Sequence, residues 1–380
     1  MQSAKLSAAL RPEECSYRLP EMTLILPVTV HPMLPQVQYD LPCWVRSYIT
    51  DVAGMDLEEW LNTGFELWTC HAYPHAREDR LLRMTRYAVA VTVADDETTR
   101  KNAPFGGSSA YAKAAVRVWE DMLHGRQATP AEAPAWWQLM GDAWNDLCQD
   151  MSDGLRERFL ADQCRILRRS VTEVEIREQG NELELEDYMD LRRDTIYGAV
   201  CWHLAEYGLG IDLTEEFSRH PDELGAVWQD ANDHLIVVND LFSFRKEWFV
   251  EQDTSLNASS ILRRNKGLTV QQLVNRYADR AAELERSYVQ KCVEITTTSW
   301  GNTPRMHAYL REIGHIMAAT LHFSRFTSRY HAVGFLWNGI TDATVTMLPE
   351  RTLISPNHRT RPNYRTPYLY RSPFTSADGS

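Results

Sequence analysis

The chain has 380 residues, of which 44% are hydrophobic and 24% charged, and its formal net charge is −12. These values are typical of a globular protein with a sizeable core, and the negative charge argues against nucleic acid as a partner, because phosphate backbones are bound by Lys- and Arg-rich surfaces. Seven cysteines form no CxxC pair, and no apolar run is long enough to span a bilayer. We therefore expect a cytoplasmic protein with reduced thiols that does not bind membranes.

The periodicity of the chain predicts an all-α fold with irregular ends. Residues 1–40 contain five prolines and are expected to be extended, and the tail 349–380 has few aliphatic residues, which is typical of a disordered tail or a lid. Between them, residues 41–348 are expected to form one helical domain. Apolar residues recur there at three- and four-residue spacing in the segments 80–94, 108–124, 155–178, 186–207, 223–250, 269–297 and 304–334.

The first chemical signal is the pair Asp95 and Asp96 in "VADDETTR", at the end of an apolar helix that begins near Leu81. Adjacent carboxylates are costly there, because like charges repel and the carboxyl end of a helix disfavours anions. A divalent cation relieves both problems, and Mg²⁺ prefers carboxylates, waters and substrate phosphates as ligands. For an acidic pair alone, a solvated helix end is the alternative interpretation.

The second signal is "NDLFSFRKE" at 239–247, where Asn239, Ser243 and Glu247 follow one another at four-residue intervals. A helix turns about 100° per residue, so these side chains fan over about 80° of one face. They offer a carbonyl, a hydroxyl and a carboxylate, a set of oxygen ligands that suits a hard ion. An exposed polar stripe is the alternative, but the apolar and aromatic residues around the motif argue against it.

Together these segments resemble the class I terpene synthases of the bacterial type. "DDETT" resembles that family's aspartate-rich motif, and residues 239–247 match its second metal motif, N-D-x-x-S-x-x-K-E, in full. Arg193 stands 46 residues before Asn239, the offset of the family's diphosphate-sensing arginine, and its neighbour Arg192 is the alternative for that role. Arg329 and Tyr330 match an Arg–Tyr pair near the end of its last helix. The similarity runs from about residue 26 to 340.

The resemblance implies a single-domain helical bundle that ionises and cyclises an isoprenyl diphosphate, with three Mg²⁺ ions and release of diphosphate. A homodimer is one oligomeric state found in the family. The chain departs from the family's pattern at two positions. Thr99 stands where the aspartate-rich motif usually has its third acid. Tyr197, four residues after Arg193, stands where the family often has Gly. The implied metal ligands are Asp95, Asp96, Asn239, Ser243 and Glu247, with Asp95 bridging metals and Asp96 or Glu97 behind it. The implied diphosphate ligands are Arg193, Lys246, Arg329 and Tyr330.

The hydrocarbon chain of such a substrate needs an apolar, water-free pocket, in which aromatic faces stabilise positive charge by roughly 0.5–2 kcal/mol each. The segment before Asp95 is dominated by small residues, "AVAVTVA", which favours a roomy pocket and the C20 substrate geranylgeranyl diphosphate over the C15 farnesyl diphosphate. The candidate pocket residues are Phe65, Trp68, Ala88, Val91, Thr92, Tyr197, Trp202, Phe242 and Phe326.

The sequence suggests three alternatives to a synthase that acts on geranylgeranyl diphosphate. A sesquiterpene synthase acting on farnesyl diphosphate differs only in pocket size. A prenyl-chain elongase would need a second Asp-rich motif where this chain has Asn, Ser and Glu, so it is disfavoured. A non-catalytic helical binding protein would explain the helices but not the metal- and diphosphate-directed residues.

Overall fold

The structure is a computed structural model of the chain. It describes residues 16–20, 22, 25–99, 104–130, 132–248, 254–331 and 344–346. The predicted tail 349–380 lies outside these ranges.

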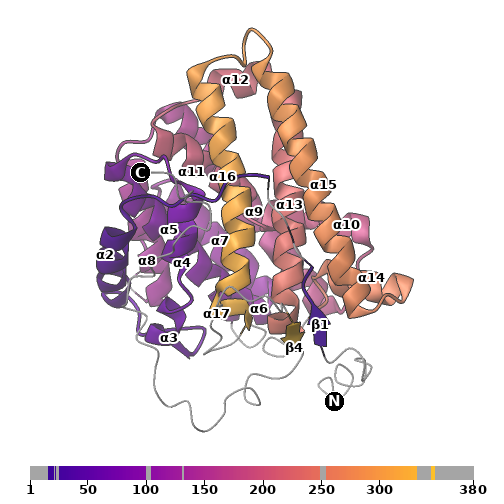
Figure 1. Ribbon diagram of the computed structural model, residues 1–380. Coiled ribbons are helices and arrows are strands. Elements are labelled where there is room, and N and C mark those ends of the chain that lie inside the picture. The colour runs from indigo at the N-terminus through magenta and orange to yellow at the C-terminus, as the bar shows by residue number, and fades with distance from the viewer. Residues whose placement is uncertain are drawn as a thin grey trace, which may run out of the picture.

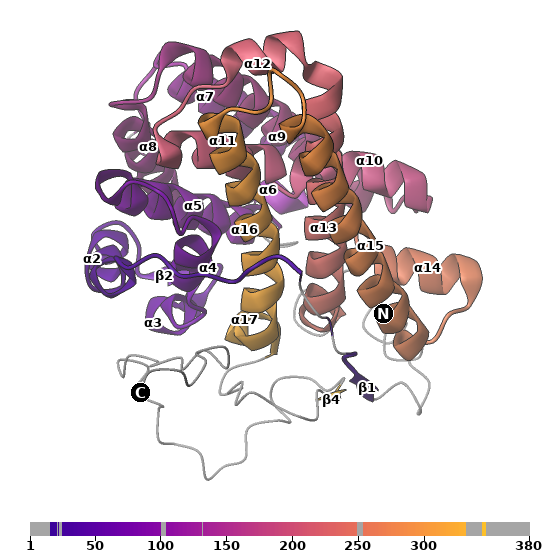
Figure 2. The same cartoon turned by 45° about the horizontal axis from the view of Figure 1, so that its top comes forward.

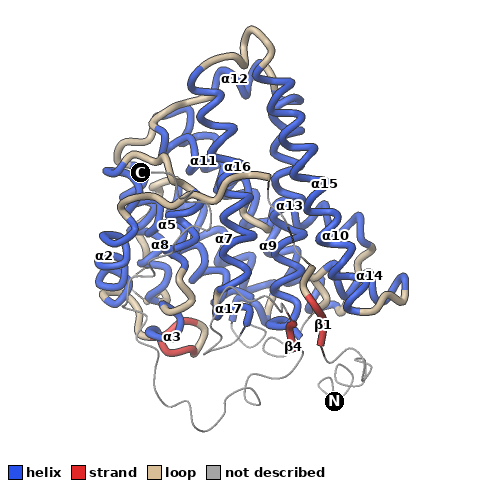
Figure 3. The backbone as a smooth tube through the Cα atoms, viewed as in Figure 1, coloured by secondary structure: helices blue, strands red, loops and turns tan. Residues whose placement is uncertain are grey.

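The described residues are mainly helical, which confirms the all-α prediction (Figures 1 and 3). Two short antiparallel pairs complete the fold: β1 (Ser16–Arg18) pairs with β4 (Thr344–Thr346), and β2 (Asp51–Val52) pairs with β3 (Met55–Asp56). The helices are α2 (Leu34–Arg46), α3 (Leu57–Leu61), α4 (Phe65–Ala72), α5 (Glu78–Thr99), α6 (Pro104–Gly107), α7 (Ser109–Leu123), α8 (Ala135–Cys148), α9 (Asp153–Gln179), α10 (Leu185–Thr195), α11 (Gly198–Leu209), α12 (Thr214–Arg219), α13 (Pro221–Lys246), α14 (Ala258–Lys266), α15 (Val270–Thr296), α16 (Pro304–Phe326) and α17 (Ser328–His331).

Helix α11 is the centre of the bundle. Every residue from Gly198 to Gly208 is buried, and a helix that is apolar all round is expected to be enclosed by others. It packs against α5, α9, α13 and α16. The long helices α13, α15 and α16 run alongside one another, as both cartoon views show (Figures 1 and 2). This arrangement places the carboxyl ends of α5, α13 and α16 in one part of the molecule.

Local sequence signals explain where the long helices begin and end. Helix α13 starts with Pro221 in its first turn and ends with Arg245 and Lys246, charges that suit the negative end of a helix dipole. Helix α15 begins with a capping box, in which Thr269 and Gln272 satisfy each other's backbone donors. Helix α5 is the exception, because its last turns carry the acidic pair at the unfavourable end.

The segment predicted as one helix over 186–207 is two helices in the structure. Helix α10 ends at Thr195 and α11 begins at Gly198, and between them Tyr197 has a φ of 62°. A side chain rarely adopts this left-handed region, so the break is a strained point of the backbone. A Cβ atom at Gly198 would stand 1.8 Å from the Asn232 amide oxygen on α13, so any other residue there would displace the Asn232 side chain, which accepts from Trp202.

The predicted N-terminal boundary also differs. Residues 34–40 were expected to be extended, but α2 begins at Leu34, because Pro35 occupies the first turn of a helix, where its missing N–H costs nothing. The segments α8 and α14 were not predicted as helices, and the helix predicted to continue to 334 ends as α16 at Phe326.

Residues 25–31, hereafter the N-terminal strap, cross α15, α16 and α4 (Figures 1 and 2). The backbone N–H groups of Ile25 and Leu26 donate to Glu285 on α15, at 3.0 and 2.8 Å. The Pro27 carbonyl contacts His315 on α16, and that of Thr29 contacts His71 on α4. The strap is therefore held to the bundle largely by side chains.

The cysteines that the structure describes are all free thiols. Within the described ranges, no helix combines the length and the apolar composition that a membrane span requires.

Candidate active site

The acidic pair at the end of α5 faces the short helix α17. The guanidinium of Arg329 donates to both oxygens of Asp96, at 2.6 and 2.7 Å, and the indole N–H of Trp60 donates to the same carboxylate at 2.9 Å. Lys246 Nζ lies 3.8 Å away. Burial opposes the charge of Asp96, but Arg329, Lys246 and these hydrogen bonds hold its pKa well below the usual range. Asp96 is thus a fully paired, buried anion.

Asp95 is placed differently from its neighbour. Its side chain is 43% exposed, and Arg329 Nη2 lies 3.9 Å from its Oδ2 atom. Its pKa is raised, because the surrounding protein reduces the solvation of the carboxylate and because Asp96 repels its charge. Asp95 therefore offers an accessible carboxylate that would gain from a nearby cation.

Asn239 lies on the face of α13 that points toward these groups. Its amide oxygen accepts from Arg192 Nη2 at 3.0 Å, and its amide nitrogen donates to the Tyr330 hydroxyl at 3.0 Å. Tyr330 directly follows Arg329 on α17, so these two residues connect the carboxylates at the end of α5 to Asn239 on α13. The acidic motif of α5 and the polar motif of α13 therefore belong to one site.

Ser243 lies one turn further along α13, and Glu247 is the residue that directly follows this helix. The Ser243 hydroxyl donates to Glu247 Oε1 at 2.6 Å, and Asn257 Nδ2 donates to Glu247 Oε2 at 2.8 Å. Asn257 also caps α14 by accepting from the Ser259 N–H at 2.8 Å. Both carboxylate oxygens of Glu247 are held in place, one of them by the start of another helix.

A buried carboxylate fixes the helix that carries this motif. Asp240 accepts from the Tyr188 hydroxyl at 2.8 and 2.9 Å and from the Ala258 N–H at 2.9 Å. Burial raises the pKa of Asp240 to about 6, against the opposing charge of Arg192. Asp240 thereby ties α13 to α10 and α14 behind the polar face.

Arg193 is not part of this group. Its guanidinium donates to both oxygens of Asp233 on α13, at 2.7 and 3.0 Å, and is 34% exposed. Its neighbour Arg192 lies in the site instead and keeps a buried Nε without a hydrogen-bond partner among the described residues. Burial opposes the charge of Arg192, but Tyr188, Glu173, Asp240 and Asp95 raise its pKa. The structure thus places Arg192 where the sequence analysis expected Arg193, because adjacent residues on a helix point about 100° apart.

The candidate pocket residues on α5 share one face. Ala88 and Val91 each retain 9% exposure and Thr92 is partly buried, whereas Tyr87, Val89, Ala90 and Val93 are completely buried. The first group lies one and two turns before Asp95, in the direction expected for a substrate chain that extends from the diphosphate. This face is lined by small side chains.

The aromatic pocket candidates differ in their surroundings. Phe65 contacts the site directly, since Arg329 lies over its ring at 5.6 Å, and Trp68 donates from its indole to Thr320. Trp202 and Phe242 are packed into the two main cores, at 0% and 2% exposure. Tyr197 is partly buried at the α10–α11 break, and the side chain of Phe326 lies outside the described part of the chain.

Three contributors were missed by the sequence analysis: Trp60, Asn257 and Tyr188, the partner of Asp240. Asn257 carried a local signal, since an Asn before "ASS" is a typical helix start, but nothing in the sequence linked it to Glu247. Glu97, expected behind the metals, accepts from the Ala53 N–H at 2.6 Å and so fastens the β2–β3 turn.

The donor set fits a hard divalent cation. Asp95, Asn239, Ser243 and Glu247 present only oxygen ligands, which suits Mg²⁺ and not a softer ion. Both oxygens of Asp96, which the sequence analysis named as a metal ligand, already accept from Arg329 in this structure.

An all-α bundle that brings an acidic pair and an Asn-Ser-Glu face to one cation-rich site is a class I terpene synthase. The family described as "Terpene synthase family 2, C-terminal metal binding" matches residues 86–287, which is more than half of the chain. The chain belongs to this family and is a terpene cyclase, a lyase that depends on a divalent metal.

Relatives and solved structures agree with this assignment. The "Microbial Terpene synthase-like protein 13" of Selaginella moellendorffii is 24% identical over 325 residues, covering 84% of this chain and 89% of that protein. "Sesquiterpene synthase M422DRAFT_47084" of Sphaerobolus stellatus is 26% identical over 236 residues, covering 61% and 64%. The crystal structure of the SVS_A2 protein from ancestral sequence reconstruction superposes with a TM-score of 0.71 at 18% identity, covering 80% and 90%, and supports the fold.

Proposed function

We propose that the chain ionises an isoprenyl diphosphate and cyclises the resulting allylic cation, releasing diphosphate. The observation that carries the proposal is the continuous chain of contacts from Asp96 through Arg329 and Tyr330 to Asn239, which brings metal-binding oxygens and diphosphate-binding donors together. A non-catalytic binding protein would not need both sets at the same place.

The metal would be held by Asp95 on α5 and by Asn239, Ser243 and Glu247 on α13, with three magnesium ions as the expected number. Bound magnesium would supply Lewis-acid neutralisation of the leaving diphosphate oxygens. Ser243 and Asn257 hold Glu247 in one orientation from two sides. This limits the reorganisation that ligand binding requires.

Four donors of this chain would bind the diphosphate. Arg192, Lys246, Arg329 and the Tyr330 hydroxyl lie around the same carboxylates, and charge-assisted hydrogen bonds to phosphate oxygens are about twice as strong as neutral ones. We assign the diphosphate-sensing role to Arg192 because Arg193 is committed to Asp233. Asp96 would then position Arg329 by its two hydrogen bonds and would not itself bind metal.

The hydrocarbon chain would extend along the α5 face formed by Thr92, Val91 and Ala88. Phe65 is the aromatic residue best placed to face a developing cation, since its ring already lies against the Arg329 guanidinium. Water must be excluded from this region, or the cation is quenched before it cyclises.

For the substrate length we propose farnesyl diphosphate, C15, on the support of the relative named as a sesquiterpene synthase. Geranylgeranyl diphosphate, C20, is the second candidate, favoured by the small side chains on the α5 face. Neither length follows from the family alone.

The test is diphosphate release with Mg²⁺ and C10, C15 or C20 substrates, with mass spectrometry of the hydrocarbon products. We expect a cyclic C15 product and no turnover after chelation of the metal. Glu247→Ala should abolish turnover while the helical circular dichroism stays unchanged. Absence of release with every substrate would refute the enzyme, and a longer linear diphosphate formed only with isopentenyl diphosphate would indicate chain elongation.

A further inference from the structure

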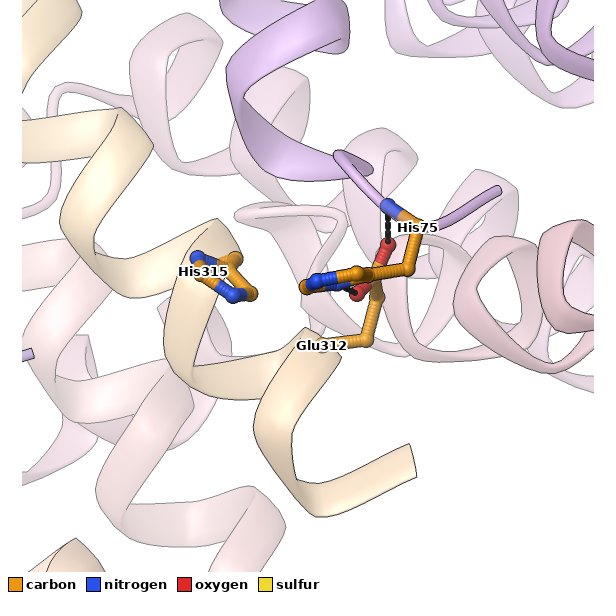
Figure 4. A group of neighbouring side chains, drawn as sticks. All are labelled: His75, Glu312 and His315. Carbon is orange, nitrogen blue, oxygen red and sulfur yellow. Dashed lines mark hydrogen bonds and ion pairs between the residues drawn. The ribbon is translucent and has the colours of Figure 1, made fainter. Parts of the chain in front are cut away.

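Two histidines and a glutamate meet on the side of the bundle that the N-terminal strap crosses (Figure 4). Glu312 and His315 lie one turn apart on α16, and His75 lies in the turn between α4 and α5. One ligand atom from each residue lies within 4.8 Å of the others. In Figure 4 the His75 ring lies over the Glu312 carboxylate and points toward His315.

The glutamate and His75 are already joined. Glu312 Oε2 lies 2.9 Å from His75 Nδ1, and Oε1 accepts the His75 backbone N–H at 3.2 Å. The side chain of Glu312 is only 1% exposed, whereas that of His75 is 44% exposed. Burial raises the pKa of Glu312 against the opposing influence of His75, so a further positive charge beside this carboxylate would be favourable.

His315 is oriented as metal-binding histidines commonly are. Its Nδ1 lies 3.1 Å from the Pro27 carbonyl, which can only accept, so Nδ1 carries the hydrogen and Nε2 keeps its lone pair. The ring is tilted by 50° to that of His75 with 5.0 Å between the centroids. Burial, followed by the charge of His75, lowers the pKa of His315 to about 4, so the imidazole is neutral near pH 7.

An ion pair between His75 and Glu312 accounts for two of the three residues, and the Pro27 carbonyl accounts for the Nδ1 atom of His315. Neither contact explains why the His315 ring lies beside that pair. A second pair of histidines on α4 and α16 provides a comparison for this site. His71 on α4 and His322 on α16 also lie with 5.0 Å between ring centroids, and His71 Nδ1 also contacts a strap carbonyl, that of Thr29, at 2.8 Å. No carboxylate completes a three-residue metal-binding group with that pair among the described residues.

We propose that His75, Glu312 and His315 form a site for a divalent transition metal of the zinc type, which clamps α16 to the α4–α5 turn beneath the strap. Two imidazoles and a carboxylate suit zinc and its neighbours and do not suit Mg²⁺. Three protein ligands leave one position for water, on the exposed side of His75. The site is separate from the oxygen-only active site, since α16 continues for eleven residues beyond His315, roughly 16 Å.

The test is zinc binding to the folded full-length chain at saturating Mg²⁺, measured by competition with a chromogenic zinc chelator. We expect one tight equivalent whose affinity falls at least about tenfold in His75→Ala and Glu312→Gln, and is unchanged in the matched control His71→Ala. Zinc should raise the thermal midpoint of the wild type and of the control but not of His75→Ala, each compared with its own zinc-free midpoint. The zinc-free midpoint of His75→Ala should be lower than that of the wild type, because Glu312 loses its ion-pair partner.

Equal affinity in the wild type and His75→Ala, or an equal loss in His71→Ala, would overturn the proposal, as would the absence of a tight equivalent. Replacement of zinc by Co²⁺ gives a second readout, because a tetrahedral nitrogen and oxygen site produces visible d–d absorption that should vanish in His315→Gln. Turnover of prenyl diphosphates is measured separately without zinc, so failure of the zinc site and failure of the proposed reaction are distinguishable.

Discussion

Arg192 donates from its guanidinium to the amide oxygen of Asn239, across the gap between α10 and α13, at 3.0 Å. This contact selects Arg192, and not the next residue, as the arginine that faces the metal and diphosphate site. The spacing in the sequence favoured Arg193, whose guanidinium is instead bound to Asp233.

The two arginines make a matched pair for mutation. We expect Arg192→Gln to lower kcat by about 10²–10³-fold, the usual cost of removing one donor to a developing anion, with little change in the folded structure. Arg193→Gln should lower the thermal midpoint, because Asp233 loses its partner, and should leave kcat within a few-fold of the wild type. Steady-state diphosphate release and thermal unfolding of both variants provide the measurement. The reverse order of activities would restore Arg193 as the sensor.

Replacement of Asp95 and of Asp96 by Asn should have different effects on the stability of the protein. The raised pKa of Asp95 means that its charge is unfavourable in the folded state, so Asp95→Asn should keep or raise the thermal midpoint while it abolishes turnover. Asp96→Asn leaves Arg329 without its carboxylate and should lower the free energy of unfolding by on the order of 3 kcal/mol. Thermal unfolding and diphosphate release on both variants test this contrast. If Asp96→Asn were stable and inactive while Asp95→Asn stayed active, Asp96 would be the metal ligand and Asp95 would not.

Asn257 should control metal affinity through Glu247. Asn257→Ser keeps a residue that caps α14 but is too short to reach Glu247 Oε2, so the carboxylate loses one of its two anchors. We expect the Mg²⁺ concentration for half-maximal turnover to rise by about 10–100-fold, with kcat at saturating Mg²⁺ much less affected. Ser259→Ala, on the same turn of α14, is the control. An unchanged Mg²⁺ dependence in Asn257→Ser would show that Asn257 does not orient Glu247.

His234 on α13 should contribute to acid sensitivity. It is 1% exposed, and burial lowers its pKa to about 4. Below a pH near 6.5, the unfolded chain takes up this proton more readily than the folded one, so stability is present above that pH and is lost as the pH falls toward 4. His234→Leu should therefore reduce the loss of unfolding free energy between pH 7 and pH 5 by about 2 kcal/mol. Denaturant unfolding at both pH values tests it, with the exposed His307→Leu as control, and equal losses in the wild type and His234→Leu would contradict it.

Much of the fold was predictable because the helices of this chain are amphipathic or wholly apolar over long stretches. The segments around 155–178 and 269–297 were located to within a few residues, since their apolar residues recur at three- and four-residue spacing. The apolar periodicity did not predict the break at Tyr197, because a tyrosine in the left-handed region is stable only where surrounding contacts impose it. One contact at the break is the close approach of Gly198 on α11 to Asn232 on α13, which the sequence does not reveal.

The sequence alone determined which oxygen ligands share a face, because the α-helical repeat fixes Asn239, Ser243 and Glu247 relative to one another whatever surrounds the helix. It also indicated the family, since the motifs that define it are local. Only the tertiary structure decided that Asp96 is bound by Arg329 and that Arg192 faces Asn239. Those pairings join residues far apart in the chain, and they depend on how each helix is rotated about its axis, which packing sets and local pattern does not.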